Sequence, residues 1–437
     1  MALSENGHIA ETGNKMHHEE RIVIVGGGFG GLCFAAALHK VGLKAVVLEQ
    51  SDKLRPEGTT MTLWNNGMRI LELFGLADQF RSMYLNVPGA EHLNQYGRRL
   101  AILDHSDCEG GPHEMRCVER KVLLEALAGQ VPQGTIRLNS RVTNIKKSET
   151  SPNVTNLELQ DGSTYSAKVV VGFDGVNSIV GSWLGLEKPK SVGQLEVRGM
   201  AEFHNGYNFP KLLRLFYGRT VRIGILPMTA TKVYWFVIWN DSSEGWRNIT
   251  PEEIKQEVLQ LTKDFQVPQF TLCVNNTSME TLIKNTLRHR INMKPTWETQ
   301  VASNVTVCGD ASHPSTPNIG QGGAMAFEDA IILARKLHQA LRSKESQISK
   351  VSESERIHQA LLDFHRERHG RTYALTHKAY MIGLSAIPDT AIKCFIRDWF
   401  FIPRAVGRGN YLEPTLFDVG NLPIDEEESH NEEESHN

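Results

Sequence analysis

A glycine-rich turn placed directly after a short apolar run is the feature that most constrains the fold of this chain. Residues 21–25 are apolar and β-branched after the first Arg, as a buried parallel strand requires, and the turn Gly26-Gly-Gly-Phe-Gly-Gly31 follows at once. Apolar residues at helical spacing continue to residue 41, and a second apolar run, residues 44–48, ends in Glu49. This order predicts a β-α-β unit built on parallel strands.

The glycines of the turn have separate tasks. Gly26 permits the tight turn, Gly28 lets the backbone approach a pyrophosphate, and Gly31 lets the helix pack on the strand. The following helix N-terminus supplies N–H donors and a partial positive charge. Glu49 stands where a carboxylate can accept hydrogen bonds from ribose hydroxyls. We therefore predict a dinucleotide site that also includes Gly30; the turn alone leaves NAD and FAD open, and a ligand-free glycine turn is the alternative.

Composition excludes several functional classes. The chain has 437 residues, enough for two or three domains, and 47 Lys and Arg against 50 Asp and Glu give no basic field for nucleic acid. The six cysteines form no C-x-x-C pair, so neither a zinc site nor a disulfide framework is expected, and we predict no metal. The first 20 residues hold no apolar stretch of the kind a secretory signal needs, which leads us to expect a cytoplasmic protein.

The middle of the chain differs in character from both ends. Between residues 197 and 240, alternating stretches rich in aromatic residues predict a β-rich region, in which we expect most aromatics to form core. A further strand and long helix are expected at residues 304–341, with helices thereafter. The predicted organisation is a discontinuous nucleotide-binding domain (21–195 and 286–345), a β-rich substrate domain (196–285), a C-terminal helical region (346–405) and disordered tails (1–20 and 424–437).

Two later strand ends choose between the cofactors. Residues 169–173 end in Asp174-Gly175, and residues 306–308 end in Gly309-Asp310. With the N-terminal turn, these motifs resemble in order and spacing the signature of class A FAD-dependent monooxygenases, the para-hydroxybenzoate and salicylate hydroxylase superfamily. Residues 309–329 are most similar to plant zeaxanthin epoxidase and its salicylate-hydroxylase-like relatives. The resemblance implies an α/β fold: a Rossmann-like FAD domain of glutathione-reductase type with an inserted β-rich substrate domain and C-terminal helices.

The resemblance also implies roles for individual residues. Asp310 would bind a ribityl hydroxyl of FAD, Arg120 would contact the flavin, and Asp174 with Gly175 would lie near the pyrophosphate and the approach of the nicotinamide. One departure is Gly181, which stands where the Asp-Gly motif normally ends in Arg. The cofactor loop would be completed by Pro317, Gly320, Gly322 and Gly323, whose backbone N–H groups could face the flavin.

The implied activity is monooxygenation. FAD, reduced by NADPH or NADH, would react with O₂ to a C4a-hydroperoxide that hydroxylates or epoxidises a small aromatic or isoprenoid lipophilic substrate. Arg198, before Gly199, matches an Arg-Gly found near substrate in relatives, and a surface or salt-bridged arginine is the alternative. Two rival functions stay open: an FAD oxidase or dehydrogenase, and a prenyl-binding protein without redox activity.

Two features near the C-terminus have competing interpretations. Residues 380–403 combine apolar residues with Lys393 and Arg397, which is consistent either with a weak peripheral membrane contact or with helices that cover the core. The second interpretation is favoured because Pro388 breaks a long amphipathic run. His365 and His369 have a spacing that could offer two metal ligands, but the charged residues around them lead us to expect a solvated face. The sequence does not indicate an oligomeric state.

Overall fold

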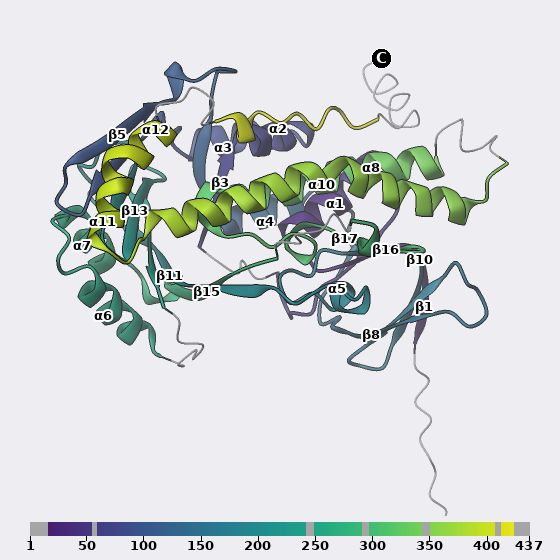
Figure 1. Cartoon of the computed structure of the whole chain (residues 1–437). Helices are drawn as coiled ribbons and strands as arrows, with labels where there is room; N and C mark the ends of the chain where they lie inside the picture. The colour runs from purple at the N-terminus through teal and green to yellow at the C-terminus, as the bar shows by residue number, and fades with distance from the viewer. Residues whose placement is uncertain are drawn as a thin grey trace, which may run out of the picture.

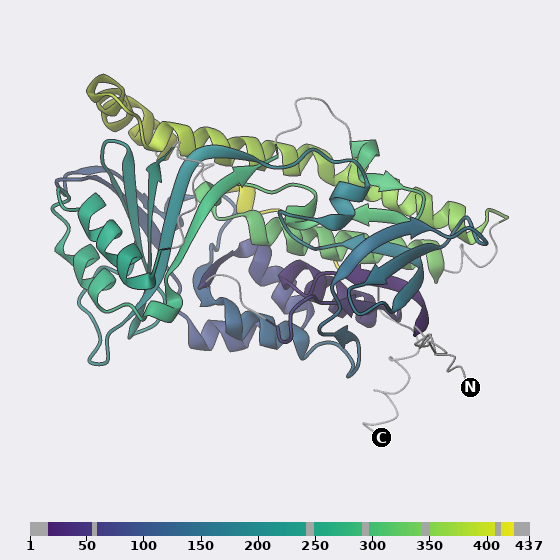
Figure 2. The same cartoon turned by 90° about the horizontal axis from the view of Figure 1, so that it is seen from below.

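The computed structural model describes residues 16–54, 59–241, 249–290, 297–342, 350–406 and 412–423. Two sheets lie side by side, and one long C-terminal helix runs along both of them (Figures 1 and 2). The predicted α/β fold with C-terminal helices is confirmed. Of the expected tails, 1–20 and 424–437, residues 1–15 and 424–437 lie outside the described residues.

The first sheet has a parallel centre and carries the predicted β-α-β unit. Its strand order is β16-β17-β10-β1-β2-β7, with β9 also paired to β10 and β8 paired to β9. Val23 pairs in parallel with Val46, and Val170 pairs in parallel with Val305. The strands are β1 (His17–Val25), β2 (Val46–Leu48), β7 (Ile136–Arg137), β8 (Val142–Lys147), β9 (Thr155–Leu159), β10 (Thr164–Gly172), β16 (Val301–Ala302) and β17 (Val305–Val307).

The start of β1 corrects the expected N-terminal tail. Residues 17–20 belong to the expected tail, but they form the first part of the strand and pair with Thr164 to Ala167 of β10. The side chains of these polar residues stay largely accessible. Backbone pairing with β10, rather than apolar burial, therefore orders this part of the strand.

The second sheet has seven strands in the order β15-β11-β14-β13-β12-β4-β5. Its strands are β4 (Gly89–Asn94), β5 (Arg99–Asp104), β11 (Lys190–Glu202), β12 (Leu213–Tyr217), β13 (Val221–Pro227), β14 (Lys232–Asn240) and β15 (Ile283–His289). β4 pairs in parallel with β12, so this sheet takes two strands from residues 89–104 as well as those expected between 196 and 285. The domain boundaries stay a prediction. A separate ribbon pairs β3 (Thr60–Trp64) with β6 (Met115–Glu119).

Helices cover the first sheet and link it to the second. α1 packs against α8, and α8 in turn packs against α10, whose length carries it past both sheets (Figure 1). The described helices are α1 (Phe29–Lys40), α2 (Asn65–Leu73), α3 (Ala77–Met83), α4 (Arg120–Ala128), α5 (Ile179–Trp183), α6 (Pro251–Leu261), α7 (Pro268–Asn275), α8 (Gly322–Leu341), α10 (Glu353–Ala386), α11 (Ala391–Ile396) and α12 (Ile402–Val406). Short 3₁₀ turns are η1 (His105–Asp107), η2 (Met279–Thr281), η3 (Trp297–Gln300), η4 (Gly309–Ala311), η5 (Pro317–Ile319) and η7 (Glu413–Thr415), and a π-helical turn, η6 (Arg397–Phe401), joins α11 to α12.

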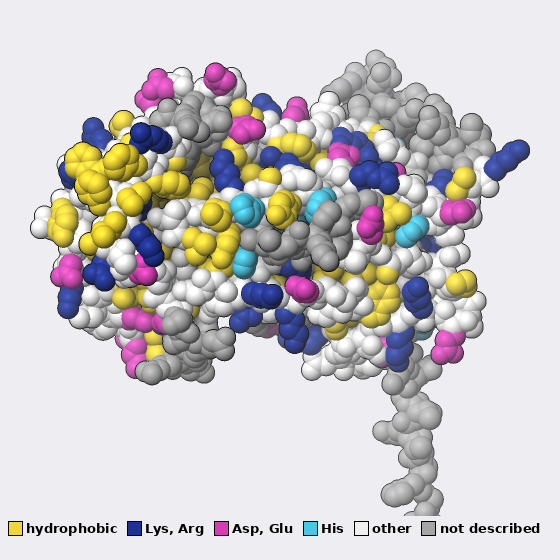
Figure 3. Space-filling view, viewed as in Figure 1, with side chains coloured by type: hydrophobic (Ala, Val, Ile, Leu, Met, Phe, Trp, Pro, Cys, Tyr) yellow, Lys and Arg dark blue, Asp and Glu magenta, His cyan; other side chains and the backbone are white. Residues whose placement is uncertain are grey.

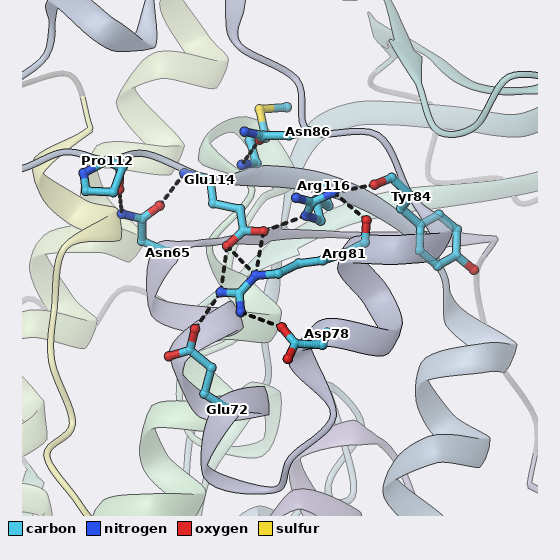
Figure 4. A network of polar contacts seen from close by, with 10 residues as sticks. Asn65, Glu72, Asp78, Arg81, Tyr84, Asn86, Pro112, Glu114 and Arg116 are labelled. Carbon is cyan, nitrogen blue, oxygen red and sulfur yellow. Dashed lines mark hydrogen bonds and ion pairs between the residues drawn. The ribbon is translucent and has the colours of Figure 1, made fainter.

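A polar network fixes the segment that leads into β6 and α4 (Figure 4). Arg81 of α3 binds Glu114 at 3.0 Å and also contacts Glu72 and Asp78, while Arg116 binds the other oxygen of Glu114 at 2.6 Å. Burial acts to raise the pKa of Glu114, but the two guanidinium groups outweigh it and lower that pKa. The ionised carboxylate therefore anchors the start of β6 to α3.

Candidate active site

One cavity of about 970 Å³ joins the two halves of the fold. It is lined by the N-terminal glycine turn, the ends of β10 and β17, the start of α8, one face of the seven-stranded sheet, and α10. The structure brings to this cavity every predicted site residue except Gly31: Gly26, Gly28, Gly30, Glu49, Arg120, Asp174, Gly175, Arg198, Asp310, Pro317, Gly320, Gly322 and Gly323. The ligand each of them binds stays a prediction.

The backbone of the first turn explains where its glycines stand. Gly26 has a φ of +106°, and a Cβ at Gly31 would lie 2.0 Å from the Gly26 carbonyl oxygen, so these two positions require glycine for the fold itself. At Gly28 a Cβ would meet no protein atom within 4 Å, because this residue faces the cavity. Space at Gly28 with close packing at Gly31 is the pattern expected when a ligand, rather than protein, approaches the turn.

Two helices begin at the cavity without a side-chain cap. Gly28, which has no side chain, precedes α1, and Gln321, whose side chain does not cap the helix, precedes α8; neither first turn holds an acidic residue. Their free N–H groups and positive helix ends favour an anionic ligand. Gly320 has a φ of +61°, and a Cβ there would lie 3.2 Å from Trp64 Nε1. Glycine therefore allows this backbone conformation and the close approach of Trp64 to the turn. FAD, with its pyrophosphate and anionic reduced ring, fits this donor set.

Glu49 and Asp174 hold backbone as well as facing the cavity. Glu49 accepts hydrogen bonds from the backbone nitrogen of Gly27 at 2.8 Å and from that of Ser51 at 2.9 Å, which ties the glycine turn to the end of β2. Asp174 accepts from Ser178 Oγ at 2.5 Å and from the backbone nitrogen of Ile179 at 2.7 Å, so it caps the start of α5. Burial raises the pKa of Asp174, and these hydrogen bonds oppose that rise.

Gly181 stands at the position where the family motif has an arginine, and protein atoms lie close to it. A Cβ at Gly181 would lie 3.2 Å from Ser178 Oγ and 3.3 Å from the Ala311 carbonyl oxygen, so a larger side chain needs a local shift. Arg290, from another segment, donates to that same Ala311 oxygen at 2.7 Å and to the Ser312 carbonyl at 3.0 Å. A guanidinium group thus reaches the Gly309–Ala311 turn from a different part of the chain.

Asp310 faces the cavity from the turn after β17. Its side chain is accessible from the cavity. The surrounding protein nevertheless removes much of its water and raises its pKa, and the charges of His313 and Arg120 oppose that rise. Arg120 begins α4 and places its guanidinium 4.5 Å from the centre of the Phe29 ring, at the start of α1. An acceptor and a cation therefore stand at the same cavity, as a ligand with hydroxyl and anionic groups requires.

A buried charge network supports the Asp310 turn from behind. Asp329 of α8 accepts a hydrogen bond from the backbone nitrogen of Gly309 at 2.9 Å. It also binds His313 Nε2 at 2.6 Å and Arg368 Nε at 2.7 Å. Arg368 also reaches Glu328 at 2.8 Å. Burial acts to raise the pKa of Asp329, but His313 and Arg368 outweigh it and hold that pKa well below its usual range. His313 therefore stabilises the loop.

The solvated face expected around His365 is wrong. Arg368 and His365 are only 2% and 4% exposed, and Arg371 binds both oxygens of Glu328. The sequence pattern looked solvated because the matching acids lie on α8, about forty residues away, where no local spacing reveals them. Within the described ranges, no group of three His, Cys, Asp or Glu side chains is arranged to hold a metal ion.

The far side of the cavity carries a second polar cluster, which we name the arginine cluster: Glu196, Arg198, Arg222, Tyr234 and Asn318. Arg198 Nη1 lies 3.6 Å from Glu196 Oε2, and Arg222 donates to Asn318 Oδ1 at 2.7 Å. Burial raises the pKa of Glu196, and Arg198 and Arg222 oppose that rise. Sequence reasoning found Arg198 but missed its partners.

Strand register explains how the cluster forms. Glu196 and Arg198 are two residues apart on β11, so they share one face of the sheet, and Ile238 of β14 pairs with both Glu196 and Arg222. The signal available in the sequence was Arg222 itself, a charge inside the otherwise apolar strand β13. Lys378 of α10 also lines the cavity, and no local pattern in the sequence distinguishes it from the other charged residues of that helix.

The aromatic residues of the second sheet divide by strand alternation. Tyr234 and Phe236 line the cavity, whereas Trp235 lies fully buried on the opposite face and packs edge to face on Phe270. Phe216 is buried in the same cluster as Trp235. Most of these aromatics thus form core, as expected, whereas the rings of Tyr234 and Phe236 give the arginine cluster's end of the cavity apolar surface.

Comparisons with known proteins agree with this geometry. A family model described as "FAD binding domain" matches residues 19–364. The chain is 36% identical over 408 residues to "Monooxygenase 2" of Arabidopsis thaliana, covering 92% of this chain and 98% of that protein. It is 33% identical to "Monooxygenase 1" of the same plant, covering 83% and 90% respectively.

A solved structure shows the same fold. Klebsiella pneumoniae HpxO complexed with FAD and uric acid superposes with a TM-score of 0.75 at 18% identity, covering 93% of this chain and 98% of that one. The family match over most of the chain, the plant relatives and the glycine cradle at two helix N-termini lead to one assignment. The chain belongs to the class A FAD-dependent monooxygenases, and FAD is its cofactor.

Proposed function

We propose that this monooxygenase uses NADPH or NADH and O₂ to hydroxylate or epoxidise a small lipophilic molecule, aromatic or isoprenoid, that carries an acidic oxygen group. The observation that carries the proposal is one cavity with two chemically different ends: the glycine turns and Asp310 at one, the arginine cluster with Tyr234 and Phe236 at the other. One oxygen atom enters the substrate and the other leaves as water, with two electrons from the nicotinamide.

The cofactor end has a defined task for the chain. When bound, FAD supplies the electron transfer and the activation of O₂, and the protein supplies position and field. The N-termini of α1 and α8 would donate N–H groups to anionic parts of the cofactor, and Arg120 would add a cation. The apolar residues on the cavity wall, Phe236 and Ile238 among them, limit the water that reaches the reacting groups.

The substrate end favours an anion. Two guanidinium groups face one carboxylate, which leaves an excess of positive charge, and Lys378 adds to it. Within the described residues, the Nε atoms of Arg198 and Arg222 are buried and have no hydrogen-bond partner. A ligand that supplies phenolate or carboxylate oxygens to the guanidinium groups at the cavity wall would balance this excess of positive charge. Tyr234 and Phe236 offer the apolar surface for the rest of the molecule.

The test compares matched acids and esters. Purified holoenzyme is given hydroxybenzoates, prenylated phenolic acids and their methyl esters, and NADPH oxidation, O₂ uptake and incorporation of labelled oxygen are measured. We expect the acids to stimulate all three readouts more than the esters. Arg222→Gln should raise KM for the acids by roughly tenfold to a hundredfold, the value of a charge-assisted hydrogen bond. Arg214→Gln is the matched control, because Arg214 lies on the neighbouring strand β12 and binds Glu91 instead.

The outcomes separate the alternatives. Equal stimulation by acids and esters refutes the acidic substrate but leaves the monooxygenase. Flavin reduction without labelled oxygen in any product identifies an oxidase or dehydrogenase. Protein that binds the compounds, yet shows no NADPH-dependent flavin reduction with any of them, identifies a binding protein without redox activity.

A further inference from the structure

Residues 391–406, which we name the C-terminal hook, present an apolar face to solvent. The hook comprises α11, η6 and α12 and follows α10 after a sharp bend of 119°. Apolar side chains gather over it in the space-filling view (Figure 3). Its exposed members are Ile392 at 74%, Phe395 at 54%, Ile396 at 52%, Trp399 at 54%, Phe400 at 49% and Phe401 at 44%.

The inner face of the hook is partly polar, which reverses the usual pattern of a surface helix. Arg397 is only 4% exposed and donates to the carbonyl oxygens of Gly218 at 2.7 Å and Ala386 at 2.9 Å. Ile402 and Val406 do pack into the core, so the expectation of core-covering helices holds for α12. In α11 and η6, however, a buried arginine attaches the helix while the aromatic side chains point outward, an arrangement that water alone does not favour.

Cations stand around the exposed apolar side chains. The Arg98 guanidinium, from the turn between β4 and β5, lies 4.5 Å from the centre of the Trp399 ring. Arg404 is exposed, and so is Lys393, which forms an exposed ion pair with Asp389. Large apolar side chains beside Arg and Lys are the composition of a helix that lies in the interface of an anionic membrane.

The helix that leads into the hook also lines the cavity. Ile382 and Lys378 of α10 line the cavity, while Met381 and Leu384 on the same turns of that helix are 49% and 45% exposed. Figure 2 shows the hook projecting from the end of α10 beyond the sheet. A projecting apolar surface suits insertion among lipid headgroups, and α10 would connect that contact to the cavity that takes a lipophilic substrate.

We propose that the C-terminal hook docks the protein on an anionic membrane surface, with Phe395 and Trp399 entering the headgroup region. In the described part of the chain, no single helix combines the length and apolar composition needed to cross a bilayer, although α10 and the hook pass that test together as one bent pair. The contact is peripheral and reversible, since it depends on a few side chains and nearby cations.

Vesicle sedimentation of the holoprotein tests the proposal. Phosphatidylcholine vesicles with and without phosphatidylserine are used, and bound protein is quantified by its flavin absorbance. We expect binding to the anionic vesicles that weakens as salt is raised, because surface charges are screened. Phe395→Ser combined with Trp399→Ser should reduce binding by about tenfold or more, given the apolar area removed. Lys393→Gln with Arg404→Gln should reduce binding to the anionic vesicles only.

The control variant carries Leu272→Ser and Val351→Ser, two apolar residues that are each 48% exposed outside the hook. It should bind vesicles as the unchanged protein does. All variants are checked for flavin content and for mass by light scattering. Absence of vesicle binding overturns the proposal, as does binding that the hook variant leaves unchanged. If the unchanged protein does not bind vesicles but forms a dimer, and only the hook variant is monomeric, the apolar face serves self-association instead.

Discussion

Replacing Arg368 by Met should be among the most destabilising single changes in this chain. Arg368 of α10 binds Asp329 and Glu328 of α8, and all three side chains are at most 2% exposed. Met has similar length but no charge, so the variant leaves two carboxylates in the core without this cation. Because α8 begins at the cofactor cavity, the same change reaches the FAD site.

The magnitude follows from which partners survive. Breaking a buried ion pair by removal of one partner typically costs 3–5 kcal/mol. Asp329 keeps His313 and the backbone of Gly309, and Glu328 keeps Arg371 and Asn66, so the low end of that range applies. We expect a loss of about 3 kcal/mol in the free energy of unfolding.

Urea unfolding of the holoprotein, followed by circular dichroism, measures the loss, and flavin fluorescence reports FAD release in the same titration. Arg366→Met is the control: it lies on the same helix, its side chain is 63% exposed, and it pairs with Asp363. That change should cost less than about 0.5 kcal/mol, as exposed pairs do. A loss below about 1 kcal/mol for Arg368→Met would refute the view that this network joins α10 to α8.

Three further predictions concern the cofactor end and its support. Asp310→Ala should lower FAD retention after gel filtration, and unchanged flavin occupancy would remove Asp310 from the site. Gly28→Val should leave the circular dichroism spectrum intact but weaken FAD binding. Gly31→Ala should instead lower thermal stability, because only at Gly31 does backbone occupy the place of a Cβ. Equal stability of the two variants would contradict this expectation. Burial lowers the pKa of His365 to about 3, so its neutral ring contributes stability above the unfolded-state pKa of about 6.5, and that contribution is lost as pH falls toward 3. His365→Gln should therefore lose less stability than the unchanged protein between about pH 6.5 and 5, which thermal melts across that interval would measure.

The fold and the cofactor end could be read from the sequence because their signals are local. The glycine turn, Glu49, and the acids at the ends of β10 and β17 each stand beside the strand that positions them, and parallel strands bring their carboxyl ends together. Such a motif needs only a strand, a turn and a helix in order.

The arginine cluster and the network around Arg368 could not be read in this way. Glu196, Arg222 and Asn318 come from three separate elements and meet only through antiparallel register and the return of the chain near α8. Arg368 looked like one charge among many on α10 until α8 was placed against it. The orientation of the hook is similarly nonlocal, because its inner face is set by two carbonyl groups that accept from Arg397.

The mixed origin of the seven-stranded sheet has a consequence for synthesis of the chain. β4 and β5 emerge from the ribosome early, but Ala90 of β4 pairs with Leu213 of β12, which is made much later. At translation rates of 5–20 residues per second, the β4 edge stays without its partner for on the order of 10 s. An open strand edge is a site for wrong pairing during that interval. Slower translation between these strands should therefore increase the demand for chaperones, and residues 196–285 expressed alone would lack the two strands, β4 and β5, that complete their sheet.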